Sequence, residues 1–146
     1  MHVYLGADHN GFELKSKVID WLASRKITFT DFGAIEYDGD DDFNDYARKV
    51  AEAVLRNNSE GHFGVLICGS GQGMCMQANR YKGIRAALCR DASEVYEPRG
   101  HDHANVLCIP ANTASEHFAE ILDAFLSVPE LPDAKYQRRA RKLDED

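Results

Sequence analysis

The sequence predicts an α/β fold in three layers, with a five-stranded parallel sheet between two layers of helices. Short apolar runs alternate along the chain with longer segments whose apolar residues recur at helical spacing. One run, Val65-Leu66-Ile67, is uninterrupted and rich in β-branched residues, as expected for a strand covered on both faces. Strands and helices that alternate in this way form parallel sheets wound by right-handed crossovers.

Each element follows from its own pattern. The helix at 12–25 is expected because Leu14, Val18 and Leu22 recur at helical spacing, and the acidic, glycine-containing stretch 33–42 is expected to be a loop. The expected strands cover residues 2–7, 27–32, 63–68, 84–89 and 105–109, and the expected helices cover 12–25, 43–55, 72–80, 91–99, 114–126 and 134–143.

Length and charge limit the functions to consider. The chain has 146 residues, which fits one domain over 1–146, with 128–146 as a basic C-terminal extension. Its net charge of −7 argues against nucleic acid as a partner. No apolar run approaches the roughly 20 residues of a membrane span, and the start shows no signal-peptide pattern. A cytoplasmic protein that does not bind membranes is therefore expected, and its four cysteines, without a C-x-x-C pair, are expected to be free thiols.

The strand at 63–68 ends in a cysteine that three regularly spaced glycines follow. Gly69, Gly71 and Gly73 leave the backbone free to adopt positive φ and to turn its N–H groups toward an anion. A helix is expected to begin at Gln72, so its positive end adds to the same field. A thiol there, Cys68, is expected to lose its proton readily. The alternative is an inert buried cysteine, which is also the expectation for the three others.

Spacing excludes the better-known glycine loops. A dinucleotide fingerprint needs glycine at position 74, which is Met. A nucleophile elbow centred on Ser70 needs glycine at 68 and 72, which are Cys and Gln. A Walker loop needs a following Gly-Lys pair, which is absent. An anion cradle beside a thiol remains.

Two further polar clusters flank strands. Asp8-His9-Asn10-Gly11 follows the first strand, and His101-Asp102-His103 stands just ahead of the fifth. Ligands in such folds gather at the carboxyl edge of the sheet, so both clusters are expected there. Histidines and aspartates could bind a metal, but hydrogen-bonding roles are favoured and no metal is expected. Asp8 could equally cap a turn.

The C-terminal segment is basic in an otherwise acidic chain. Its helical pattern lacks a long apolar stripe, so the helix is expected to dock on a neighbouring subunit or an anionic ligand, or else to remain solvated. The cations concerned are Lys135, Arg138, Arg139, Arg141 and Lys142.

Several of these segments resemble the type B ribose-5-phosphate isomerases, a family that includes galactose-6-phosphate isomerase. They are Gly6-Ala7-Asp8-His9-Asn10-Gly11-Phe12-Glu13-Leu14-Lys15, Leu66-Ile67-Cys68-Gly69-Ser70-Gly71-Gln72-Gly73-Met74, Ala78-Asn79 and Gly83-Ile84-Arg85-Ala86-Ala87. The resemblance extends from residue 3 to about residue 143 and implies a Rossmann-like fold. It also implies a cofactor-free isomerisation of ribose 5-phosphate and ribulose 5-phosphate through a cis-enediolate, in a homodimer or homotetramer with a shared active site.

The resemblance also implies roles for individual residues. Cys68 would be the base, Ser70 and the neighbouring backbone N–H groups would hold the enediolate, and His101 would open the sugar ring. Asp8 would hold hydroxyl groups, and His9 with the basic tail would receive the phosphate. The implied substrate-binding residues are His9, Gly69, Gly71, Gln72, Gly73, Asp102, Lys135 and Arg139.

The chain departs from the family pattern at the far end of the substrate. Asp102 replaces an asparagine, Asn112 replaces a phosphate-binding arginine, and Lys135 replaces another. Arginine to asparagine loses both the charge and the bidentate fork. Met74 stands where some members have glutamate, which leaves Cys68 as the candidate base. The open alternatives are an isomerase of another sugar phosphate or sugar acid, a non-catalytic sugar-binding homologue, and a metal-dependent hydrolase that uses His101 and His103.

Overall fold

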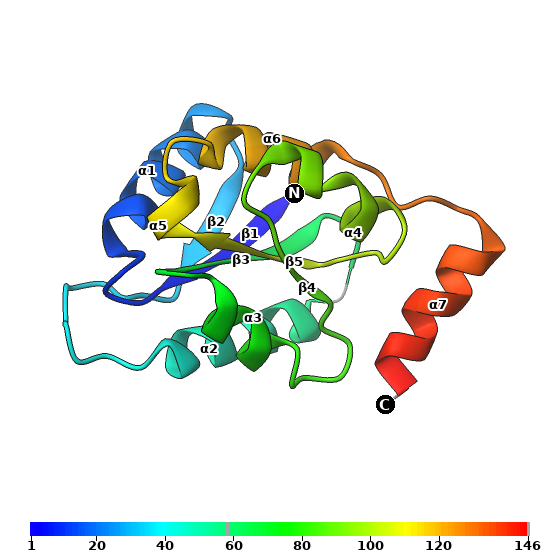
Figure 1. The fold of residues 1–146 in the computed structure, drawn as a ribbon, viewed down its shortest axis with the longest axis horizontal. Helices are drawn as coiled ribbons and strands as arrows, with labels where there is room; N and C mark the ends of the chain where they lie inside the picture. Colours follow the sequence, from blue (N-terminus) through cyan, green and yellow to red (C-terminus); the bar gives the residue numbers. More distant parts are fainter. Residues whose placement is uncertain (58, 146) are drawn as a thin grey trace.

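The computed structural model describes residues 1–57 and 59–145 and contains the predicted parallel sheet. Its strand order is β2-β1-β3-β5-β4, and all four pairings are parallel (Figure 1). All four cysteines are free thiols, as expected. The strands are β1 (His2–Ala7), β2 (Thr28–Asp31), β3 (His62–Cys68), β4 (Ala86–Leu88) and β5 (Val106–Pro110).

Helices cover both faces of the sheet, which gives the predicted three layers. Helices α1, α4 and α6 lie on one face, and α2 and α3 lie on the other (Figure 1). The helices are α1 (Phe12–Ser24), α2 (Phe43–Arg56), α3 (Gln72–Ala78), α4 (Tyr96–Gly100), α5 (Ala111–Ala114), α6 (Phe118–Ser127) and α7 (Ala134–Glu145), with a short 3-10 turn, η1, at Ala92–Glu94.

The alternation of side chains along β3 decides which face each residue meets. Val65 and Ile67 belong to the core under α1 and α6, whereas Leu66 and Cys68 belong to the core under α2 and α3. All four are at most 5% exposed. The buried strand therefore carries the Cys68 thiol to the carboxyl edge on the α2 and α3 side.

Two predicted helices are wrong as continuous elements. The one at 91–99 is divided into η1 and α4, and the Asp91 side chain caps η1 by accepting from the Ser93 N–H. The one at 114–126 is interrupted as well, because Ala114 ends α5, residues 115–117 form a turn and α6 begins only at Phe118. The Ser115 hydroxyl bonds the Ala111 carbonyl oxygen, which competes with continuation of the helix.

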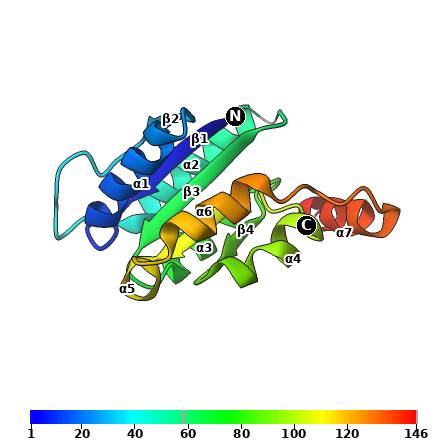
Figure 2. The same ribbon diagram turned by 90° about the horizontal axis from the view of Figure 1, so that it is seen from above.

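Helix α7 stands beside the layered body and is connected to it through α6 and a linker (Figures 1 and 2). Only Ala140 of this helix is buried. The Arg85 guanidinium binds the Asp144 carboxylate at 2.7 Å and so joins the end of α7 to the segment before β4. None of the helices within the described residues is long and apolar enough to cross a membrane.

One buried arginine fixes the start of that linker. Arg99, on α4, is 4% exposed, and its guanidinium forms an ion pair with the Glu130 carboxylate at 3.3 Å. Its guanidinium lies over the aromatic rings of Phe63 and Phe125. It donates to three backbone carbonyl oxygens, those of Ala104, Phe125 and Val128.

Candidate active site

The glycine loop at the end of β3 forms a tight backbone turn around the Cys68 thiol. Gly71 adopts φ +74°, and a Cβ there would lie 2.3 Å from Leu88 Cδ1, so any larger residue would be strained. Ser70 Oγ accepts the Gln72 N–H at 3.3 Å where α3 begins. Gly73 lies under the ring of Phe43, which a Cβ would meet at 2.7 Å. The predicted turn is therefore present.

The Cys68 thiol is harder to ionise than its sequence context indicates. Burial raises its pKa, and the nearby Asp8 carboxylate raises it further. Backbone N–H groups of Ser70, Gly71 and Met74 act in the opposite direction, as expected for an anion cradle, but burial is the largest effect. The prediction that the thiol loses its proton readily is thus wrong for the ligand-free protein.

Asp8 is held next to this loop by an Asx turn. One carboxylate oxygen, Oδ1, accepts the N–H groups of Asn10 at 3.0 Å and Gly11 at 3.1 Å. Gly11 packs so closely on β3 that a Cβ would lie 2.4 Å from the Ile67 carbonyl oxygen. Burial raises the pKa of the Asp8 carboxyl above its usual value. The turn-capping interpretation of Asp8 is confirmed, and it coexists with a place beside the thiol.

His9 pairs with an aspartate that the sequence did not single out. The Asp41 carboxylate, in the loop before α2, accepts one hydrogen bond from His9 Nδ1 at 2.7 Å and another from the His9 backbone N–H at 3.2 Å. This carboxylate raises the pKa of the His9 imidazole. Potential ligand atoms of Asp8, His9 and Asp41 lie within 4.8 Å of one another, the one such group found in residues 1–57 and 59–145. Hydrogen bonds already engage all three side chains.

The cluster at 101–103 lies at the opposite edge of the sheet, so its expected place is wrong for a single chain. It precedes β5, whose far end, Pro110, pairs with Cys68. His101 stacks on Tyr136 of α7, with ring centroids 4.3 Å apart and planes at 3°. His103 Nε2 lies 3.2 Å from the Leu131 carbonyl oxygen, and this ring is buried, so His103 has a structural contact here.

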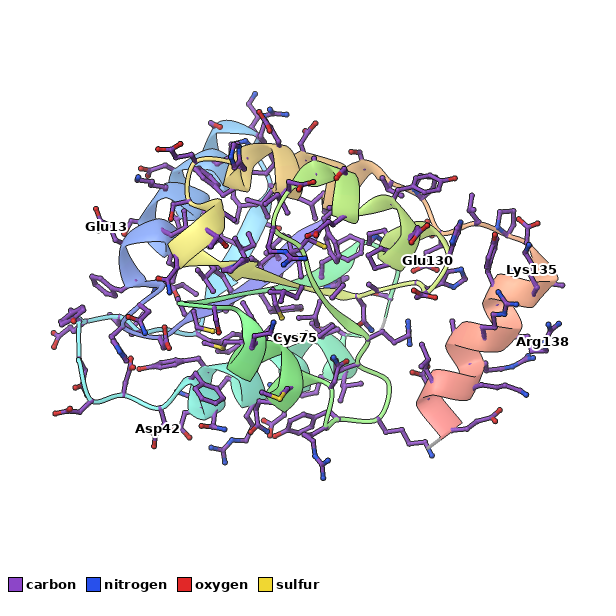
Figure 3. All side chains as sticks on the ribbon, viewed as in Figure 1. Glu13, Asp42, Cys75, Glu130, Lys135 and Arg138 are labelled. Atoms are coloured by element: carbon purple, nitrogen blue, oxygen red, sulfur yellow. The ribbon has the colours of Figure 1, made fainter. Side chains whose placement is uncertain are left out.

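The predicted site residues therefore form two separate groups. Asp8, His9 and the 68–73 loop lie at the carboxyl edge, whereas His101 and Asp102 lie near α7. Lys135 and Arg138 project from α7 (Figure 3). Arg139 belongs to the same helix, and the Lys135 ammonium lies 4.7 Å from the centroid of the Tyr136 ring.

A small polar cavity opens beside the glycine loop. It has a volume of about 320 Å³, and two amides that line it, Asn10 and Asn112, also face Gly69. Lys17 and Glu13 bring charges of opposite sign to it. A larger cavity of about 680 Å³, lined by Arg85, lies at the other edge of the sheet, away from the thiol. The smaller cavity adjoins the glycine loop through Asn10 and Asn112.

Two residues that contact the glycine loop are not predicted by the sequence. Asn10 belongs to a polar cluster after β1, and Phe43 begins α2. Asparagine after an Asp-His pair and an aromatic residue at a helix start are too common for the sequence to mark them as neighbours of the glycine loop. The close approach to Gly69 and Gly73 becomes visible only when β1, β3 and α2 are packed together.

A parallel sheet with a thiol, a backbone anion cradle and a carboxylate at its carboxyl edge defines an α/β enzyme for a small polar substrate. The model of one family, described as Ribose/Galactose Isomerase, matches residues 3–143. The chain belongs to this family, a family of isomerases.

Individual relatives agree with this assignment. The chain is similar to a probable ribose-5-phosphate isomerase B of Mycoplasma pneumoniae, with 39% identity over 142 residues that cover 97% of this chain and 91% of the relative. It is 36% identical to ribose-5-phosphate isomerase B of Mycobacterium tuberculosis over 146 residues, which cover 99% of this chain and 86% of that one.

Solved structures confirm the fold. Ribose 5-phosphate isomerase of Thermotoga maritima superposes with a TM-score of 0.92 at 40% identity, covering 99% of this chain and 98% of the other. Ribose-5-phosphate isomerase B of Mycoplasma genitalium, crystallised with bound ribulose-5-phosphate, also gives 0.92, at 34% identity and with 99% and 94% coverage.

Proposed function

We propose that this protein interconverts ribose 5-phosphate and ribulose 5-phosphate. The observation that carries the proposal is the Cys68 thiol held over a turn of backbone N–H groups at the end of β3. The names of the relatives and the ribulose-5-phosphate in the Mycoplasma genitalium structure support the substrate. One domain over 1–146 would suffice for this reaction, which we place in the cytoplasm.

In the proposed mechanism the Cys68 thiolate removes the C2 proton of the open-chain aldose. The electron pair of the broken C–H bond forms the C1–C2 double bond of a cis-enediolate, and negative charge moves to the oxygen at C1. The hydroxyl proton on the C2 oxygen passes to the C1 oxygen, and return of the carbon-bound proton from the thiol to C1 then gives the ketose with its carbonyl at C2. Backbone N–H groups over 69–73, with Ser70, stabilise the oxygens as charge develops. Met74 is fully buried and has no basic group.

Asp8 and His101 have supporting roles in this scheme. The Asp8 carboxylate lies beside the thiol and can accept hydrogen bonds from sugar hydroxyl groups. His101 would carry a proton to or from the ring oxygen and so open the cyclic sugar before the proton transfer.

A complete site then requires a second copy of the chain. His101 and α7 lie at the edge opposite to Cys68, so a partner must bring its own copies of them to the thiol. A homodimer, or a homotetramer built from such dimers, meets this requirement. The partner's α7 would add positive charge for the phosphate, since Lys135 keeps the charge of an arginine and Arg139 keeps the bidentate fork as well.

The substrate can be tested by following exchange of the C2 hydrogen with deuterated water. Ribose 5-phosphate should exchange much faster than ribose, and faster than hexose phosphates or uronates. If it exchanges no faster than the unphosphorylated sugar, the proposed substrate is wrong. If a uronate exchanges fastest, the protein is a sugar-acid isomerase instead. Asn112 supports this alternative, because asparagine lacks the charge and the paired donors with which an arginine binds phosphate.

The same assay separates the other classes. A sugar-binding homologue without catalysis would bind ribose 5-phosphate and exchange nothing. A metal-dependent hydrolase would release inorganic phosphate and lose that activity on treatment with a chelator, whereas the proposed isomerase should be unaffected by it.

A further inference from the structure

The side chain of Asp41 is nearly removed from solvent, although it comes from an acidic surface loop. It is 5% exposed, and its Oδ1 accepts both Nδ1 and the backbone N–H of His9. Its Oδ2 is the one buried side-chain oxygen or nitrogen found without a hydrogen-bond partner in residues 1–57 and 59–145. A buried, half-satisfied carboxylate is costly unless a positive group compensates it.

His9 is the cationic group that can provide this compensation. The ionisable groups that face its ring are the carboxylates of Asp8, Asp38 and Asp41, and the edge of the Tyr37 ring lies near it at 6.4 Å between centroids. All three carboxylates favour the imidazolium form. Tyr46 faces Asp41 from α2, and burial together with interaction with the Asp41 carboxylate raises its pKa to about 12, so it stays neutral and does not supply the positive charge.

The hydrogen bond from Nδ1 to Asp41 determines which ring nitrogen of His9 can contact a ligand. With Nδ1 bound to Asp41, the other nitrogen, Nε2, is left free to meet a substrate, and the side chain is 26% exposed. In the imidazolium form both nitrogens carry hydrogen, so Nε2 is a charged donor. A charged donor suits an anionic acceptor such as a phosphate.

We propose that Asp41 is a positioning residue: it orients the His9 ring and keeps it in the imidazolium form, so that Nε2–H donates to the phosphate of the sugar substrate. This rests on the proposed function, because the sugar phosphate supplies the anion. Asp41 itself does not touch the substrate, since its free oxygen is buried. His9 and Asp41 are 32 residues apart in the sequence, so they meet only because the fold brings their two loops together.

The test uses Asp41→Asn, which keeps the shape and one acceptor oxygen but removes the charge. Titration of the His9 ring by NMR in the ligand-free protein should show a lower pKa than in the wild type, because the hydrogen bond to the Asp41 carboxylate is the main cause of the raised value. The KM for ribose 5-phosphate should rise severalfold near neutral pH, and the rise should shrink as the pH is lowered, because acid protonates the imidazole without the help of Asp41. The kcat should change little.

Asp40→Asn is the matched control. Asp40 lies in the same loop and is exposed, and only its backbone N–H is engaged, by Asp38. This variant should leave the His9 pKa and the KM unchanged. A double-mutant cycle with His9→Gln adds a second criterion: once His9 is replaced, Asp41→Asn should raise the KM no further. Thermal unfolding of each variant shows whether the fold is kept.

Two results would overturn the proposal. One is an unchanged His9 pKa in Asp41→Asn, and the other is a full additional rise in KM when Asp41→Asn is combined with His9→Gln. Failure of the proposed function looks different: wild-type protein would not isomerise ribose 5-phosphate, although the His9 pKa would still fall in Asp41→Asn. In that case binding of inorganic phosphate replaces the KM as the second measurement.

Discussion

Hybrid dimers of Cys68→Ala and His101→Ala chains should regain activity that neither variant has alone. From Val106 to Pro110, the residue paired with Cys68, β5 spans about 13 Å at about 3.3 Å per residue. His101 stands five residues before that strand. Hydrogen-bond reach is only about 3 Å, so one chain cannot bring both groups to one sugar. In each hybrid dimer one of the two sites is intact, which predicts about half of wild-type turnover.

The assay is co-expression of the two chains with different tags, purification on both tags, and measurement of ribulose 5-phosphate formation. The control pairs a wild-type chain with a chain that carries both substitutions. If the site is shared, this hybrid has one defect in each site and should be inactive. If each chain had a complete site, this control would keep about half of the activity and the first hybrid would have none. That reversed pattern would refute the shared site.

Three further predictions concern the thiol and its loop. Cys68→Ala should abolish C2 hydrogen exchange and lower the free energy of unfolding by only about 1 kcal/mol, whereas Cys75→Ala should retain exchange. Because the pKa of Cys68 is raised in the ligand-free protein, kcat/KM should rise with pH between about pH 6 and 8, and a flat profile would exclude the thiolate as base. Gly71→Ala should cost about 1–3 kcal/mol in urea unfolding, through positive φ and the clash with Leu88; unchanged stability would contradict the tight turn.

The sheet and the glycine loop could be predicted because their signals are local. A short, uninterrupted apolar run rich in β-branched residues, such as Val65-Leu66-Ile67, favours a doubly covered strand, and the glycines at 69, 71 and 73 can each be recognised directly in the sequence. The turn at residues 115–117, where the Ser115 hydroxyl bonds the Ala111 carbonyl oxygen, leaves no mark in the hydrophobic periodicity. Such competition between a side chain and the backbone is settled only in three dimensions.

Most residues of the candidate site could be predicted from the sequence, but their pairing and ionisation could not. The pair of His9 and Asp41 joins two loops through the fold, and the acidic stretch 33–42 offered no reason to prefer one aspartate. Burial raises the pKa of Cys68 and the backbone N–H groups lower it. The direction of the net pKa shift cannot be obtained from the neighbours in the sequence alone. The edge on which His101 lies could have been inferred, because a residue ahead of a parallel strand belongs to the amino edge.

The buried Arg99 has a consequence for assembly. By fastening α4 to the end of α6 and to the linker beyond it, Arg99 sets the direction in which the chain leaves the body toward α7. A helix whose starting direction is fixed loses less conformational entropy when it meets a second copy, so more of the contact energy remains as affinity. A guanidinium far from the thiol would in this way help determine the protein concentration at which complete active sites exist.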